Sequence, residues 1–170
     1  MIMVDNWKGG FYMLSVYTIA KYFLARSVPD SEQAITPLKL QKLVYYAQAW
    51  HYTLFNKQLF DEEIEAWVHG PVCPPLYNYY RNYGFEVIKK PRESKEIIKL
   101  IGSNKSTKAL LEFVWDLYGR HTGKELEDLT HREDPWKKAR KNTGDYEHSN
   151  NVITLESMKT YYKRSLKGVK

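Results

Sequence analysis

The sequence predicts a mainly α-helical protein: a single helical domain around a central buried helix, with a small two- or three-stranded β element that makes it α+β by strict count. The first observation is a stretch at residues 36–54 whose apolar side chains recur at helical spacing. The second is a series of shorter segments that carry helix start and stop signals. The third is that only two short runs, residues 64–68 and 85–88, have the composition of strands. With 170 residues, the chain is long enough for one domain with a real core.

The central helix has clear start signals. Thr36 is a good N-cap, because its hydroxyl can accept a hydrogen bond from a free amide in the first turn. Pro37 follows at the first helical position, where no amide hydrogen is needed. One apolar stripe is made by Leu40, Leu43, Val44, Ala47, Trp50 and Leu54. Tyr45 and Tyr46 widen this stripe, and a helix that is apolar over much of its circumference is expected to be enclosed by its domain.

Further helices are predicted from apolar spacing and from flanking residues. They cover residues 15–26, 74–83, 107–118, 122–129 and 134–140, and a last helix begins at residue 154. Thr122 and Glu125 match a capping box, in which side chain and backbone at a helix start bond reciprocally. Asp134 is the expected cap of the following helix, with Pro135 at its first position, and Thr154 is the expected cap of the last.

The β element is predicted to begin at residues 64–68, in a strand that a Gly-Pro step ends. A second strand at residues 85–88 would pair with it. Residues 89–106 are polar and basic, which predicts a mobile connection, and a third strand would fall near Ile98. So small a sheet needs helices behind it to be stable.

Residues 1–12 are predicted to be an N-terminal extension, and residues 13–165 the domain itself. No apolar run approaches the roughly 20 residues that a helix needs to span a bilayer. The first residues lack the basic region, apolar run and small-residue cleavage site of a secretory signal. Cys73 is the only cysteine, which excludes an internal disulfide and any multi-cysteine zinc site. We therefore expect a cytoplasmic protein with no membrane contact.

The sequence contains no catalytic or nucleotide-binding motif that we recognise. The five histidines form no HExxH pair, and CxxC, GxxxxGK[ST] and GxGxxG patterns are absent. His69 and Cys73 would form a nucleophilic pair only if the fold joins them, and a small packing residue is the favoured interpretation of Cys73. His131 and Glu133 would serve as ligands or as an acid–base pair, but a helix junction anchored by Trp136 is favoured. We predict no enzymatic activity, no cofactor and no metal.

The net charge is +6, and the basic residues are clustered. The clusters are Lys89, Lys90, Arg92, Lys95, Lys99, Lys105 and Lys108; Lys137, Lys138, Arg140 and Lys141; and Lys163, Arg164, Lys167 and Lys170. One interpretation is a surface that binds nucleic-acid phosphates or an acidic protein partner. The favoured interpretation is a set of solvated helix faces and a basic tail, because charge runs most often only solvate a face.

Four aromatic residues, Trp67, Tyr77, Tyr79 and Tyr80, lie close together in the sequence. The three tyrosines fall on one short predicted helix, where neighbours point about 100° apart, so they cannot all face one core. Tyrosine and tryptophan combine a large contact area with a polar tip, which suits protein interfaces. A partner-binding surface and simple packing around the short helix are both open interpretations.

Three blocks of the sequence are familiar together. They are PLKLQKLVYYAQAW at residues 37–50, FDEEIEAWVHGPVCPPLY at residues 60–77 and LTHREDPW at residues 129–136. In this order and spacing the sequence resembles the Panacea-domain family, which includes SocA-like antitoxins and phage-associated GepA-type proteins. The resemblance covers about residues 13–162, and family members tend to begin near the start of that range.

The resemblance implies a mostly helical cytoplasmic antitoxin of a bacterial or prophage toxin–antitoxin pair. Such a protein would neutralise a cognate toxin, encoded nearby, by direct binding, and one branch of the family looks like an adaptor that delivers its toxin to a protease. The family transfers neither catalytic residues nor a toxin-contact surface. From residue chemistry we assign partner binding to Trp67, Tyr77, Tyr79 and Tyr80, and structural roles to Thr36, Pro37, Trp50, Gly70, Pro71, His131, Glu133 and Trp136. The alternative function is a nucleic-acid-binding regulatory protein that uses the basic clusters.

Overall fold

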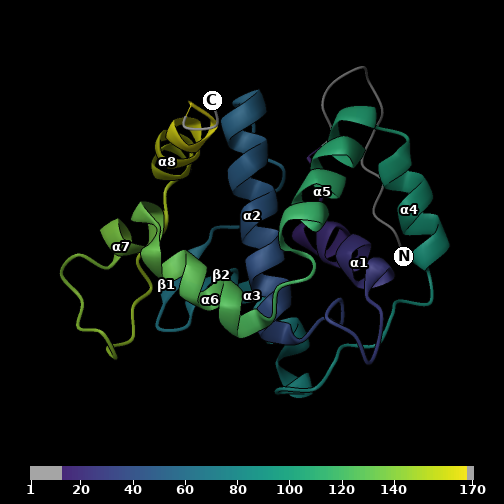
Figure 1. Ribbon diagram of the computed structural model, residues 1–170, viewed down its shortest axis with the longest axis horizontal. Coiled ribbons are helices and arrows are strands. Elements are labelled where there is room, and N and C mark those ends of the chain that lie inside the picture. The colour runs from purple at the N-terminus through teal and green to yellow at the C-terminus, as the bar shows by residue number, and fades with distance from the viewer. Residues whose placement is uncertain (1–12, 168–170) are drawn as a thin grey trace.

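The computed structural model describes residues 13–167 (Figure 1). The extension predicted at residues 1–12 lies outside the described residues. The elements in chain order are α1 (Val16–Arg26), α2 (Pro37–Phe55), β1 (Glu65–Trp67), β2 (Gly70–Val72), α3 (Pro74–Tyr80), the 3-10 turn η1 (Arg81–Tyr83), α4 (Ser94–Gly102), α5 (Lys105–Tyr118), α6 (Gly123–Arg132), α7 (Asp134–Ala139) and α8 (Leu155–Lys167). The predicted fold class, mainly α with a small β element, is confirmed.

Helix α2 runs through the centre of the molecule, between α8 on one side and α5 and α1 on the other (Figure 1). Thr36 caps it as predicted, since its Oγ1 accepts a hydrogen bond from the Lys39 amide at 3.4 Å. The helix ends at Asn56, whose φ of 54° places it in the left-handed region. Every residue from Lys39 to His51 is buried, so the prediction of a central buried helix is confirmed.

The other helices form two groups around α2. On one side, α4 packs against both α1 and α5; on the other, α7 packs against both α6 and α8 (Figure 1). The capping box at Thr122 and Glu125 is present with both of its hydrogen bonds, and α6 continues past the predicted end to Arg132. Within residues 13–167, no helix is both long enough and apolar enough to cross a bilayer.

The β element is an antiparallel hairpin of β1 and β2. The chain that leads into α8 runs along the edge of β1 that does not pair with β2. The register pairs Glu65 with Val72, Ala66 with Pro71 and Trp67 with Gly70. On the other edge of β1, Val152 forms a single bridge with Glu65. The predicted strand at residues 85–88 is wrong, because the Gly-Pro step does not end the first strand but opens its partner. Gly70 makes this turn accessible, since its φ of 95° lies where L side chains rarely fit.

The prediction of a mobile connection at residues 89–106 is also wrong, because this segment contains α4. Ile97 and Ile101 lie one helical turn apart, and both are buried in the core. Ile98, where a third strand is predicted, is an exposed residue of the same helix. The lysines that surround these isoleucines occupy the solvent side of an amphipathic helix.

Candidate partner-binding surface

The hairpin cluster consists of three ring side chains, Trp67 of β1, Tyr77 of α3 and His148 of the loop before α8. The ring centre of Trp67 lies 4.9 Å from that of Tyr77 and 5.7 Å from that of His148. Trp67 Nε1 donates a hydrogen bond to Glu65 Oε2 at 2.7 Å, which fixes the orientation of the indole. Tyr77 and His148 are exposed and Trp67 is partly exposed, so the cluster offers a partner both apolar and polar atoms.

The tyrosine cluster, formed by Tyr17 of α1 with Tyr79 and Tyr80 of α3, is separate from the hairpin cluster. The ring centre of Tyr79 lies 5.4 Å from that of Tyr17 and 4.8 Å from that of Tyr80. Tyr79 is 61% exposed, whereas Tyr80 is 7% exposed and belongs to the core. Tyr77 and Tyr79 are two residues apart on one helix and therefore point roughly 200° apart. The structure brings Trp67 and Tyr77 together and places Tyr79 on another side of α3.

Buried polar side chains of α2 hold the hairpin and the start of α3 from behind. Lys42 Nζ donates to the Pro71 carbonyl at 3.2 Å, and Gln41 Oε1 accepts from the Cys73 amide at 2.8 Å. Burial lowers the pKa of Lys42 to about 7. Gly70 lies so close to this lysine that a Cβ there would be 2.7 Å from Lys42 Cε. The hairpin therefore lies so close to α2 that a side chain at position 70 would require Lys42 to move.

The junction between α6 and α7 supports the hairpin from another side. Trp136 Nε1 donates to the Trp67 carbonyl at 2.9 Å, and the Trp136 ring stacks on His131 with centres 4.0 Å apart. Arg140 is buried, and its Nη1 donates to the Ala66 carbonyl at 2.9 Å. Trp136 is partly rather than fully buried, because it braces the hairpin at the edge of the core. Arg140, which the sequence places in a basic cluster, is an internal brace and not a surface charge.

Glu133 lies in the turn between α6 and α7 and is 4% exposed. Its Oε2 accepts a hydrogen bond from the Tyr162 hydroxyl at 2.6 Å, and its Oε1 accepts one from the Tyr46 hydroxyl at 3.3 Å. Burial raises the pKa of Glu133 to about 7, although both hydroxyls favour the ionised carboxylate. Glu133 also holds the N-cap position of α7, whereas Asp134, the predicted cap, pairs with Arg164 at 2.7 Å.

The residues considered for catalysis are not joined into one site. Cys73 is buried, and burial raises the pKa of its thiol to about 11, so it is not a thiolate at neutral pH. His69 is exposed, and its Nδ1 lies 3.3 Å from Glu127 Oε1. Burial lowers the pKa of His131, whose Nε2 has no hydrogen-bond partner in the described part of the chain. Within residues 13–167, no group of three His, Cys, Asp or Glu side chains is placed to hold a metal ion.

Several residues that build this region escape the sequence reasoning; they are Gln41, Lys42, Arg140 and Tyr162. Gln41 and Lys42 interrupt the apolar surface of an enclosed helix, and that interruption is a usable signal, because such residues are rarely fully buried without partners. Arg140 and Tyr162 carry no such signal. Their partners, Ala66 and Glu133, are distant in sequence and are identified only by the fold.

Comparison with protein families identifies the family of this chain. The model of the family described as antitoxin SocA-like, Panacea domain, matches residues 40–137, which is more than half of the 170 residues. Neither curated proteins nor solved structures give a match to this sequence. The matched range runs from α2 into α7 and contains the hairpin, α3 and the α6–α7 junction, whereas α8 lies beyond it. The resemblance drawn from the three sequence blocks is thereby confirmed, and the chain belongs to the SocA-like, Panacea-domain antitoxin family.

Proposed function

We propose that this protein neutralises a cognate toxin, encoded nearby, by direct protein–protein binding. The observation that carries the proposal is the family match over residues 40–137. The geometry of the same segment supports the proposal. Exposed ring side chains belong to the hairpin and to α3, and hydrogen bonds from α2 and from Trp136 hold the backbone of these elements in place. Rigid aromatic anchors of this kind are typical of protein interfaces.

The proposed contacts are Trp67 and Tyr77 of the hairpin cluster, with Tyr79 as a second contact on the other side of α3. Tyr79 has the largest exposed fraction of the three tyrosines, at 61% against 38% for Tyr77 and 7% for Tyr80. The buried ring of Tyr80 packs against the ring of Tyr79, and Tyr80 itself exposes little area that a partner could contact. Arginine, lysine or carbonyl groups of the toxin would meet the phenol oxygens and ring faces.

The first experiment tests the function itself. The product of the neighbouring gene is expressed alone and together with this protein, and growth is measured. We expect the product to arrest growth alone and growth to return on co-expression. A harmless product, or one that stays lethal beside well-expressed protein, would contradict the antitoxin function.

The second experiment tests the contact surface. Tyr77→Ala and Tyr79→Ala are each assayed for toxin affinity and melting temperature, with Ile98→Ala on α4 as a control for loss of an exposed apolar side chain; Figure 1 shows α4 across the molecule from the hairpin. An interface anchor is worth at least about 2 kcal/mol, or roughly thirtyfold in affinity. We expect such a loss in a tyrosine variant and none in Ile98→Ala, with melting temperatures unchanged. Full affinity in both tyrosine variants would place the interface elsewhere.

The third experiment separates masking of the toxin from its delivery to a protease. Toxin levels are followed after protein synthesis is stopped, with and without this protein. Masking leaves the toxin at least as long-lived as it is alone, since a bound protein unfolds less often. Delivery shortens its lifetime, and the effect disappears in a strain that lacks the protease.

A further inference from the structure

A second surface lies at the other end of α2, where α5 and α8 approach the same tryptophan. The ring centre of Trp50 lies 5.4 Å from that of Phe113 on α5 and 4.9 Å from that of Tyr162 on α8. Trp50 Nε1 donates to the Tyr118 hydroxyl at 3.0 Å. Trp50 is 6% exposed, so its ring forms the buried floor of this surface, beneath the side chains of the neighbouring helical turns.

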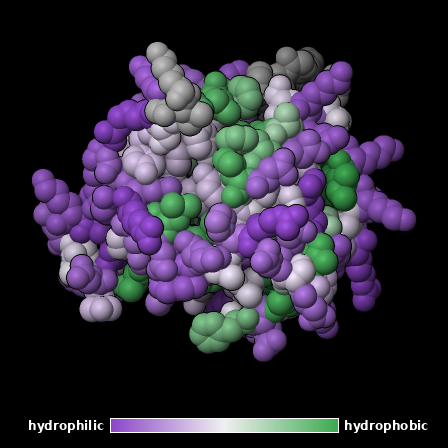
Figure 2. All heavy atoms as spheres, viewed as in Figure 1, coloured by the Kyte–Doolittle hydropathy of each residue, from purple (hydrophilic) through white to green (hydrophobic). Residues whose placement is uncertain are grey.

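Around this floor three large apolar side chains remain open to solvent. Leu54 lies one helical turn beyond Trp50 on α2, and Leu117 lies one turn beyond Phe113 on α5. Leu54, Phe113 and Leu117 are 48%, 37% and 45% exposed. Figure 2 shows hydrophobic atoms gathered on this face, over the end of α2 and along α5. We call Leu54, Phe113 and Leu117 the apolar furrow; exposed apolar side chains that gather around one point of the surface indicate a partner, whereas single exposed leucines do not.

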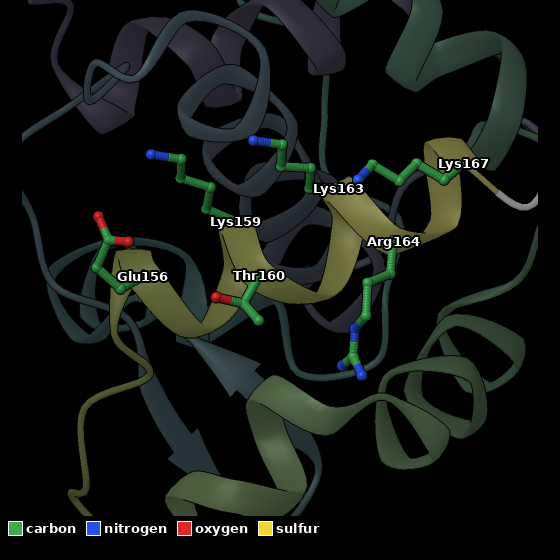
Figure 3. A pocket seen from close by; sticks show the side chains of 6 residues that line it. All are labelled: Glu156, Lys159, Thr160, Lys163, Arg164 and Lys167. Atoms are coloured by element: carbon green, nitrogen blue, oxygen red, sulfur yellow. The ribbon is translucent and has the colours of Figure 1, made fainter.

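Helix α8 borders the apolar furrow with a row of lysines. Figure 3 shows Lys159, Lys163 and Lys167 along one edge of α8, and Arg164 pointing away from them. A hollow of about 280 Å³ is lined by these three lysines together with Glu156, Thr160 and Arg164 of the same helix. Lys159 Nζ donates to Asn56 Oδ1 at 2.6 Å, just past the end of α2, which shows that the row faces that end. Among residues 13–167, Lys163 and Lys167 form no ion pair.

Glu156 of α8 lines the same hollow, and its Oε1 accepts a hydrogen bond from the Tyr52 hydroxyl at 2.7 Å. Glu112 and Asp116 of α5 raise the pKa of the Tyr22 hydroxyl in α1. Glu112 is also paired with Lys108 at 3.7 Å. Because Glu156 is the one acidic side chain among the described residues that lines the hollow, against three lysines and Arg164, the border of the apolar strip carries net positive charge.

We propose that the apolar furrow and its lysine row bind an acidic amphipathic helix of a protein partner. A helix with apolar side chains at i, i+3 or i+4, and i+7 presents a stripe that fits Leu54, Phe113 and Leu117. Glutamate or aspartate beside that stripe meets Lys163 and Lys167. This surface goes beyond the proposed function: α8 lies outside the family-matched residues, and the site is separate from the hairpin cluster.

The test uses the full-length protein and two synthetic helical peptides with the same leucine stripe, one flanked by glutamates and the other by lysines. Binding is measured by fluorescence anisotropy at low and high salt. The protein variants are Lys163→Glu with Lys167→Glu, and as a matched control Lys95→Glu with Lys99→Glu, which reverses two exposed lysines one turn apart on α4. A third variant, Leu54→Ser with Leu117→Ser, tests the apolar part.

The glutamate peptide should bind the wild type, and its affinity should fall as salt rises. Reversing Lys163 and Lys167 should weaken it about tenfold or more, while the α4 control leaves it unchanged. The Leu54 and Leu117 variant should also bind more weakly, with melting temperatures of all variants close to that of the wild type.

Four results would overturn the proposal. They are no binding of the glutamate peptide, equal binding of both peptides, equal loss in the α4 control, and stronger competition by a single-stranded oligonucleotide than by excess glutamate peptide. Concentration-dependent self-association that Lys163→Glu with Lys167→Glu abolishes would assign the surface to a second copy of this chain instead. None of these results affects the growth-rescue assay, so the proposed function is tested separately.

Discussion

The two halves of α2 both contribute to the buried core but are surrounded by different chemistry. In the first half, cationic and amide side chains reach backbone groups of the surrounding loops: Lys39 Nζ donates to the carbonyls of Glu32 and Gly119, at 2.6 and 2.8 Å, and Lys42 donates to Pro71. In the second half, the phenol of Tyr46 and its neighbours surround the carboxyl of Glu133.

This difference shows how one helix supports two unlike surfaces. The first half fixes the backbone of the hairpin, where the proposed toxin contacts stand. The second half packs ring on ring toward α5 and α8 and leaves the apolar furrow above it. A buried ionisable group lies in or beside each half, Lys42 in the first and Glu133 of the α6–α7 turn beside the second. Burial lowers the pKa of Lys42 and raises the pKa of Glu133.

The largest expected effect is loss of an aromatic ring from the second half. Tyr46 is fully buried, and its ring stacks on Tyr118 with centres 3.8 Å apart. Tyr46→Ala should cost about 3–5 kcal/mol of unfolding free energy, measured by chemical denaturation. Tyr46→Phe keeps the ring and loses the hydrogen bond to Glu133, so it should cost about 1 kcal/mol. Similar losses in the two variants would show that the hydrogen bond, and not the stacked ring, dominates this half.

The next effect is an opposite pH dependence of the two halves. The native pKa of Glu133, about 7, exceeds its ordinary 4.5, so its stabilising contribution is present below about pH 4.5 and is lost as the pH rises through about 7. The native pKa of Lys42, about 7, lies below its ordinary 10.5, so its contribution is present above about pH 10.5 and is lost as the pH falls through about 7.

Unfolding free energies of Glu133→Gln and Lys42→Met, measured across pH and compared with the wild type, check this prediction. As the pH rises from about 4.5 to 7, the unfolding free energy of Glu133→Gln should increase relative to that of the wild type. As the pH rises from about 7 to 10.5, the unfolding free energy of Lys42→Met should decrease relative to that of the wild type. Parallel curves for the wild type and either variant would mean that the replaced group has the same pKa in both states.

A smaller effect, and nearly the same in both halves, is expected for two glutamines of α2. Gln41 accepts from the Cys73 amide at 2.8 Å, and Gln48 accepts from the Leu59 amide at 2.7 Å and donates to the Phe60 carbonyl at 2.8 Å. Replacement of either glutamine by leucine leaves buried backbone groups unpaired. Each substitution should therefore lower the free energy of unfolding by about 1–3 kcal/mol. Thermal unfolding of Gln41→Leu and Gln48→Leu measures this. A strong effect for only one of them would show that one half tolerates unpaired backbone better than the other.

The smallest effect is expected at the start of the first half. Thr36→Ala removes the hydrogen bond that the Lys39 amide donates to the Thr36 hydroxyl and should cost about 1 kcal/mol, while Thr36→Ser should be close to neutral. Denaturant midpoints of the two variants give the comparison. If Thr36→Ser were as unstable as Thr36→Ala, the methyl group and not the cap would be responsible.

The sequence predicts those features that depend on neighbours along the chain. The cap at Thr36 and the capping box at Thr122 and Glu125 are local, and both are present. The hairpin register and α4 were missed for different reasons. At Gly70 a glycine that opens a strand has the same signature as one that ends it, and at Ile97 only two apolar residues mark the buried side of a lysine-rich helix.

The candidate site was predictable only in part. Trp67 and Tyr77 lie together, and Tyr79 lies on another side of α3; this division of the tyrosines depends on where the core lies. The bonds that hold the site connect Trp136 with Trp67 and Arg140 with Ala66. Such long-range pairs leave no periodic trace in one sequence, so the sequence alone groups Arg140 with the surface charges.

The chain before α8 also closes the exposed edge of β1, where the Ala66 amide donates to the Asn151 carbonyl and the Ile153 amide to the Ile64 carbonyl, each at 2.8 Å. During synthesis the hairpin leaves the ribosome long before residues 151–153 do, because chains are made from the N-terminus. Until then β1 has an unpaired edge, the kind of edge that pairs readily with other chains. The nascent protein therefore passes through a stage in which the edge beside its proposed toxin contacts is unprotected, and completion of the C-terminal segment ends that stage.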